Sequence, residues 1–255
     1  ICFSGGKLLK LLTSILSIGM LLTPLSIGHD IIEGCPVLNE AGYEIEDAIV
    51  EYTASHDSTL EASRRSTFRI ISENSEGKAV GTATLFSYKR HQIVMTAAHV
   101  VRGSDRVYME SRYELGIERE LTLVYYDEVF DIAILVPSQK IKSIASIKLR
   151  PAKHKHMTVG TKTIYSGYPN NHSLLTIHGR ISGFTSVADL VLDTYGWKGA
   201  SGSAVFDEKG RLLGILSTMD IGNGMFGMPT LIPNVITIVP ITKIEFNILD
   251  SILDR

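Results

Sequence analysis

The sequence predicts an all-β protein, built as a sandwich or as barrels, that ends in a single helix. Three observations predict this fold class. From Ser66 onward, short runs of β-branched and aromatic residues alternate with turn residues. These runs form two sets of similar size, separated near residues 137–146, which is typical of two barrels side by side. Near the end of the chain, apolar residues recur at the spacing of a helix instead.

Each set contains several predicted strands. Those of the first set cover 67–72, 79–87, 92–96, 106–110, 121–126 and 132–136. Those of the second set cover 147–150, 161–166, 174–177, 190–193, 203–206, 212–217 and 235–239. Short, closely spaced strands of this kind indicate antiparallel sheets, because parallel strands would need helical crossovers between them.

The predicted C-terminal helix covers residues 242–254. Thr242 and Glu245 have the spacing of a capping box, in which each side chain bonds the backbone amide of the other. The apolar residues that recur at helical spacing are Ile244, Ile248, Leu249, Ile252 and Leu253. We therefore expect this helix to pack on the body of the protein.

The composition excludes several classes of protein. The chain has 255 residues, of which 44% are hydrophobic and 20% charged, so it can bury a core and is not disordered. Its net charge of −2 lacks the basic excess by which proteins hold nucleic acid, so we expect no nucleic-acid partner. Two cysteines, Cys2 and Cys35, allow at most one disulfide and exclude a disulfide framework or an all-cysteine zinc site.

Residues 1–28 have the layout of a secretory signal peptide. Lys7 and Lys10 precede an apolar run, and the small residues Ser26 and Gly28 precede a cleavage point. The alternative is a hydrophobic membrane anchor, although the run is short for a span and polar residues interrupt it. The signal peptide predicts a secreted or periplasmic protein, and the alternative predicts a membrane-anchored one.

Residues 29–65 form an acidic N-terminal extension that ends in the basic pair Arg64-Arg65. A charge run of this kind is most often a solvated segment. The alternative is a propeptide that is cut at the basic pair. If a signal peptide is removed after Gly28, Cys35 is left without an internal partner.

Three polar residues in apolar or small-residue segments indicate nucleophilic catalysis. His99 ends an apolar strand, Asp131 begins a buried run, and Ser201 lies in a turn of small residues. A serine hydroxyl needs an imidazole to take its proton, and the imidazole needs a buried carboxylate to hold its tautomer. Histidine, aspartate and serine in this chain order form one of the few known arrangements of such a triad. Glycine at position 199 lets the amides of Gly199 and Ser201 converge as an oxyanion hole.

The segments that carry these residues are Thr96-Ala-Ala-His99, Asp131-Ile-Ala-Ile-Leu135 and Gly199-Ala-Ser201-Gly-Ser203. In these segments the chain resembles the trypsin-like serine peptidases, most closely their compact bacterial and viral members. The resemblance implies a chymotrypsin-like fold of two six-stranded antiparallel β-barrels, followed by the helix. The peptidase domain would cover 66–255, with barrel one at about 66–140 and barrel two at about 145–241.

The same resemblance implies a serine endopeptidase that acts on a protein or peptide substrate through an acyl-enzyme. Such a triad requires no metal or cofactor. His154 and His156 could offer two imidazoles to a metal, but no third ligand lies at a suitable spacing, so a solvated loop is favoured. Two alternatives remain open: a protease-fold binding protein without turnover, whose mark would be a broken triad, and a membrane-anchored viral polyprotein protease.

One residue departs from the pattern of the resembling family. In its vertebrate members an aspartate before the nucleophile pairs with a freed N-terminal amine on activation. Ala200 stands at that position here, so activation by amine insertion is not expected even if the Arg64-Arg65 pair is cut.

The resemblance also implies a primary substrate pocket. The residues that match its walls and floor are Tyr195, Lys198, Ser217, Thr218 and Met219. Tyr195 stands at the floor position, where a pocket for Arg or Lys would need a buried carboxylate. We therefore predict a preference for apolar or small side chains at the cleavage site. The alternative is that Asp193 or Asp220 turns into the pocket and selects a basic side chain.

Overall fold

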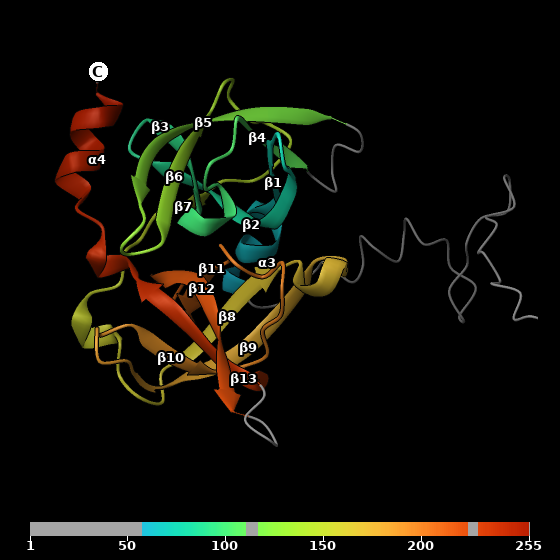
Figure 1. Ribbon diagram of the computed structural model, residues 1–255. Coiled ribbons are helices and arrows are strands. Elements are labelled where there is room, and N and C mark those ends of the chain that lie inside the picture. Colours follow the sequence, from blue (N-terminus) through green and yellow to red (C-terminus); the bar gives the residue numbers. More distant parts are fainter. Residues whose placement is uncertain (1–57, 111–116, 224–228, 255) are drawn as a thin grey trace, which may run out of the picture. The chain divides into compact units, whose positions relative to one another are not determined.

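The computed structural model describes residues 58–110, 117–223 and 229–254. The predicted signal peptide or anchor at 1–28, most of the extension at 29–65, and both Cys2 and Cys35 lie outside the described residues. The described part forms two β-barrels with a helix near each end (Figure 1). None of the helices in these ranges is long and apolar enough to cross a membrane.

Barrel one consists of six strands: β1 (Thr67–Asn74), β2 (Gly77–Tyr88), β3 (His91–Thr96), β4 (Arg106–Glu110), β5 (Glu118–Asp127) and β6 (Ile132–Pro137). Their spatial order is β1-β4-β5-β6-β3-β2, and the pairing of β1 with β2 closes the ring. All these pairs are antiparallel. A short seventh strand, β7 (Ile147–Lys148), adds to β2 in parallel.

Barrel two consists of β8 (Lys162–Gly167), β9 (Leu175–Phe184), β10 (Leu190–Asp193), β11 (Ala204–Asp207), β12 (Leu212–Asn223) and β13 (Pro229–Pro240). They form a closed barrel in the order β10-β13-β12-β11-β8-β9. The predicted fold of two six-stranded antiparallel barrels is therefore confirmed.

Two strands of barrel two are longer than predicted. The patterns at 212–217 and 235–239 mark only the apolar parts of β12 and β13, which pair with each other well beyond those parts. The register shifts twice along this ladder, between Leu216 and Thr218 and between Met219 and Ile221. Backbone hydrogen bonds hold such a ladder whatever the side chains, so hydrophobic periodicity underestimates its length.

Strand β6 is buried on both faces, which explains its continuous apolar run. Ala133 and Leu135 join the core cluster of barrel one. Ile132 and Ile134 join the larger cluster that contains the core of barrel two. Since successive side chains of a strand point to opposite faces, β6 contributes to both clusters. Asp131 directly precedes β6 and therefore lies next to the strand that the two clusters share.

The C-terminal helix is shorter than predicted and has a different start. Helix α4 spans Phe246–Leu253, and residues Ile241–Lys243 form a separate 3-10 turn, η5. Glu245 is the N-cap residue without a side-chain capping bond, so the predicted capping box at residues 242–245 is wrong. The ring centroids of Phe246 and Tyr88 lie 5.8 Å apart. Figure 1 shows α4 beside barrel one, and the chain therefore returns from barrel two to close against barrel one.

A second helix, α3 (Ser58–Ser66), precedes barrel one and contains the Arg64-Arg65 pair. The buried Ser63 hydroxyl lies 2.9 Å from the Ser166 hydroxyl of β8, and Arg64 donates to the Thr176 hydroxyl of β9 at 2.8 Å. The folded body therefore includes α3 and begins before residue 66, the start that was predicted from the sequence. Its polar sequence hid this helix, because it docks through hydroxyls and a guanidinium rather than through an apolar stripe.

Candidate active site

His99 and Asp131 are brought together by two paired strands of barrel one. His99 lies on the 3-10 turn η1 (Ala98–Val100), just after β3, and Asp131 directly precedes β6. Thr96 of β3 pairs with Ala133 of β6, so the two strand ends lie side by side. The His99 ring Nδ1 lies 2.8 Å from Asp131 Oδ2, and the His99 backbone amide donates to Asp131 Oδ1, also at 2.8 Å.

Ser217 of β12 supplies a third contact to the same carboxylate. Its hydroxyl donates to Asp131 Oδ2 in a short hydrogen bond. From the sequence, Ser217 was predicted only as a pocket residue, and its contact with Asp131 was missed. No local signal could have found it, because the two residues belong to different barrels and meet only once the barrels have packed.

The hydrogen bonds to Asp131 decide its protonation. Burial of the carboxylate favours the neutral form and raises the pKa of Asp131. The hydrogen bonds from the His99 ring, the Ser217 hydroxyl and the His99 amide oppose burial and outweigh it. The net result is a pKa for Asp131 below its ordinary value, so the group is a carboxylate at neutral pH.

Ser201 lies in the turn between β10 and β11, at the junction with barrel one. The amide of Thr82 on β2 donates to the Ser201 carbonyl at 2.9 Å. Gly202 follows at φ +88, and a Cβ at this position would overlap the Thr96 hydroxyl and the Thr82 carbonyl. The close contact between the barrels therefore requires glycine directly after the serine.

The two amides predicted to bind an oxyanion have no hydrogen-bond acceptor among the residues that the structure describes. Neither the Gly199 amide nor the Ser201 amide donates a hydrogen bond within the described ranges. The Lys198 carbonyl accepts from the Asn170 amide at 2.6 Å, and the Ala200 carbonyl accepts from the Ser203 amide at 3.0 Å. A trans peptide directs its carbonyl and its N–H to opposite sides. The Gly199 and Ser201 amides therefore point away from these contacts and are available to a ligand oxygen.

The Ser201 hydroxyl makes no hydrogen bond to the residues that the structure describes. The bond to the His99 ring that a triad needs is therefore not formed in this geometry. Contacts of this kind are often long in a free enzyme and tighten when substrate binds.

The predicted pocket residues lie around the serine turn and at the exposed part of β12. Tyr195 is 39% exposed, and its carbonyl accepts a short hydrogen bond from the hydroxyl of the buried Tyr165. Lys198 and Thr218 are also exposed. The side chains of Met219 and Asp220 lie outside the described residues, so the choice between an apolar and an acidic pocket stays a prediction.

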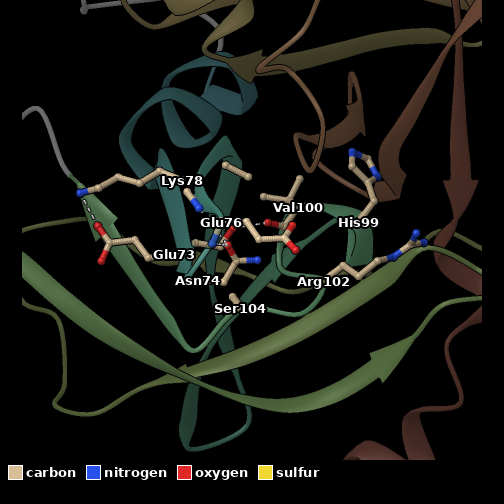
Figure 2. Close-up of a pocket in the computed structure, with 11 residues that line it drawn as sticks. Glu73, Asn74, Glu76, Lys78, His99, Val100, Arg102 and Ser104 are labelled. Atoms are coloured by element: carbon tan, nitrogen blue, oxygen red, sulfur yellow. Dashed lines mark hydrogen bonds and ion pairs between the residues drawn. The ribbon is translucent and has the colours of Figure 1, made fainter.

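A charged cavity of about 230 Å³ opens beside His99. Figure 2 shows His99 and Arg102 on one side of it and the ion pair of Lys78 with Glu73 on the other. Arg102 also pairs with Glu128 at 2.9 Å. The cavity could not be anticipated from the sequence, because the residues that line it come from two distant segments. One segment is the end of β1, the turn after it and the start of β2, and the other is η1 with the residues that follow it.

The described ranges contain no group of three His, Cys, Asp or Glu residues that could hold a metal ion. His154 and His156 lie on a 3-10 turn, η2 (His154–His156), and not on a strand. The His156 ring Nδ1 accepts a hydrogen bond from the Lys153 amide at 3.0 Å.

The structure thus combines two six-stranded barrels with a histidine–aspartate pair on one barrel and a serine turn on the other, an arrangement that fits the class of serine endopeptidases. Residues 81–215, more than half of the chain, match the family model of the trypsin-like peptidase domain. The chain belongs to the family of trypsin-like peptidase domains.

Several solved structures share this fold. A serine endoprotease from Yersinia pestis has a TM-score of 0.60 and 18% identity, covering 79% of this chain and 67% of that one. The HtrA-type protease AlgW, solved with a tripeptide, has a TM-score of 0.62 and 20% identity, covering 79% of this chain and 64% of AlgW. A protease from M. tuberculosis in its active form has a TM-score of 0.59 and 21% identity, covering 91% and 94%. None of the curated proteins matches the chain in sequence.

Proposed function

We propose that this chain hydrolyses peptide bonds through an acyl-enzyme, with Ser201 as the nucleophile and His99 as the general base. Asp131 orients His99, and the amides of Gly199 and Ser201 stabilise the oxyanion. The observation that carries the proposal is the pair of hydrogen bonds between His99 and one carboxylate: the His99 ring nitrogen Nδ1 and the His99 backbone nitrogen each lie 2.8 Å from an Asp131 oxygen. This arrangement holds the ring in position and decides which nitrogen faces the serine.

The ionised Asp131 can only accept, so the ring nitrogen beside it, Nδ1, must carry the proton. The other nitrogen, Nε2, is then an acceptor for the Ser201 hydroxyl proton. As that proton moves to Nε2, the serine oxygen bonds to the scissile carbonyl carbon, and the carbonyl oxygen becomes an oxyanion between the two amides. The imidazolium then gives its proton to the leaving amine, and water releases the acyl group by the same steps.

A fluorophosphonate probe tests the nucleophile directly. We expect it to label the full chain and not Ser201→Ala. Ser203→Ala is the matched control, because Ser203 lies in the same segment and its buried hydroxyl has no hydrogen-bond partner within the described residues. Labelling that survives Ser201→Ala, or that disappears in a folded Ser203→Ala, would contradict the assignment.

For specificity we propose the apolar or small side chain expected from Tyr195, Thr218 and Met219. Cleavage of a peptide library, with the new ends identified by mass spectrometry, measures this preference. Dominant cleavage after Arg or Lys would refute it and would point to Asp193 or Asp220.

We propose secretion or export to the periplasm from the pattern of residues 1–28, and sequencing of the mature N-terminus tests it. Retention of the apolar run would support an anchor instead.

A further inference from the structure

We propose that Thr82 is a positioning residue for the oxyanion hole. In this inference its hydroxyl holds the turn that carries Gly199 and Ser201 in the conformation that binds an oxyanion. The inference rests on the proposed function, because it assumes that these two amides bind the oxyanion. Thr82 lies on β2 of barrel one and is fully buried. From the sequence it is only one member of a predicted strand.

The partners of the Thr82 hydroxyl fix the direction of both its hydrogen bonds. The Tyr168 amide can only donate, and it lies 3.1 Å from Thr82 Oγ1. The Gly199 carbonyl can only accept, so the hydroxyl proton goes to that carbonyl, at 2.7 Å. The Thr82 hydroxyl thus donates a hydrogen bond to the serine turn and accepts one from the neighbouring loop. Serine could make both bonds, whereas valine, which has nearly the same shape, could make neither.

The bond to Gly199 fixes the peptide plane between the two oxyanion amides. On one side of this plane the Gly199 carbonyl is held by Thr82, and on the other the Ala200 amide donates to the Trp197 carbonyl at 2.9 Å. Adjacent peptide planes share a Cα atom, so rotation of this plane would turn the amides at its two ends. Gly199 has φ +94 and no side chain that would resist the rotation.

The same hydroxyl also ties down the loop that orients the preceding plane. Tyr168, whose amide donates to Thr82, leads into the 3-10 turn η3 (Pro169–Asn171). The Asn170 amide of this turn holds the Lys198 carbonyl at 2.6 Å and so directs the Gly199 amide toward the site. Loss of the Thr82 hydroxyl would therefore weaken the support of two consecutive peptide planes.

The test compares Thr82→Val and Thr82→Ser in the full chain. Thr84→Val is the matched control, because Thr84 lies two residues further on β2, is equally buried and contacts the Thr67 hydroxyl rather than the serine turn. The readouts are kcat and KM for p-nitrophenyl acetate, the rate of fluorophosphonate labelling and the melting temperature. We expect Thr82→Val to lower kcat roughly 10–100-fold and to change KM by less than about threefold, since an oxyanion contact acts mainly in the transition state.

Thr82→Ser should restore kcat to within about threefold of the wild type, and Thr84→Val should lower only the melting temperature. A kcat of Thr82→Val within about threefold of the wild type would overturn the inference, as would an equal loss in Thr84→Val. If Thr82→Val does not fold, Thr82→Cys replaces it, because a thiol is a much weaker hydrogen-bond donor and acceptor than a hydroxyl. A folded Thr82→Cys as active as Thr82→Ser would then overturn it. Failure of the proposed function gives a different result: the fluorophosphonate probe would then not label Ser201 even in the wild type.

Discussion

Asp131 accepts two hydrogen bonds from the same residue: His99 donates its ring Nδ1–H to one carboxylate oxygen and its backbone amide to the other. The two bonds fix both the position of η1 and the plane of the ring. Asp131 itself has φ +50, a left-handed conformation that costs a non-glycine residue about 1–2 kcal/mol. Such a conformation persists where surrounding contacts determine it, and His99 and Ser217 supply those contacts.

Asp131→Asn tests the orienting role of the carboxylate. In the best-studied protease triad of this fold, the same change leaves the geometry intact and lowers kcat about 10⁴-fold, because the imidazole takes the wrong tautomer. We expect a loss of that order in kcat for p-nitrophenyl acetate. Circular dichroism checks that the variant is folded. A loss below about tenfold in a folded variant would show that Asp131 is not the orienting residue.

Ser217→Ala removes one of the three donors to Asp131. A hydrogen bond to a charged group contributes about 1.5–3 kcal/mol, so we expect kcat to fall roughly 10–100-fold and stability to decrease. The pKa of Asp131 should rise, because one of the bonds that favours the carboxylate is lost. Ser203→Ala is again the control. The Ser203 hydroxyl has no hydrogen-bond partner in the described part of the chain, so its removal should leave both activity and stability nearly unchanged. Similar losses in the two variants would contradict a specific role for Ser217.

The lowered pKa of Asp131 predicts how stability responds to acid. The folded protein binds this proton less readily than the unfolded chain, so the carboxylate stabilises the fold above about pH 4, the ordinary aspartate value. That contribution is lost as the pH falls through the folded pKa. The difference in unfolding free energy between wild type and Asp131→Asn should therefore shrink from about pH 5 downward. Urea unfolding at a series of pH values measures it, and a difference that does not vary with pH would contradict the prediction.

The raised pKa of Tyr88 predicts that stability is lost at high pH, in the opposite direction to the loss expected from Asp131. Burial, followed by the hydrogen bond to Asp250 of α4, raises the pKa of Tyr88 to about 12. The neutral phenol therefore stabilises the fold fully below the unfolded value of about 10, and this contribution is lost as the pH rises through about 12. At neutral pH, Tyr88→Phe should cost about 1 kcal/mol, because the 2.7 Å bond to Asp250 is lost.

The phenolate absorbance of the wild type minus that of Tyr88→Phe isolates the titration of this one side chain. A midpoint near 10 would mean that Tyr88 is solvated and that α4 is not held by it.

Candidates for the site could be proposed from the sequence where a residue stands in a recognisable local pattern. His99, Asp131 and Ser201 stand in short segments with their own patterns, which made them candidates for the site. Each predicted strand has apolar periodicity, and the two sets of strands predicted two barrels. Ser217 and Thr82 have ordinary strand neighbours, and what distinguishes them is a contact with the other barrel. Helix α3 was missed because its contacts are polar, and the start of α4 was misplaced because a 3-10 turn occupies Ile241–Lys243. Contacts between distant segments depend on the packed structure and leave no periodic pattern.

Helix α3 also limits how this enzyme can be shortened for laboratory use. A fragment that starts at residue 66 would contain all the strands and the three residues of the proposed triad. It would lack the partners of the Ser166 and Thr176 hydroxyls, which Ser63 and Arg64 supply. Water would then reach the side of β8 that carries Ser166, which is buried in the full chain. Ser166 lies only two residues before Tyr168, where the next loop begins. Recombinant expression of a competent catalytic fragment should therefore begin at or before Ser58.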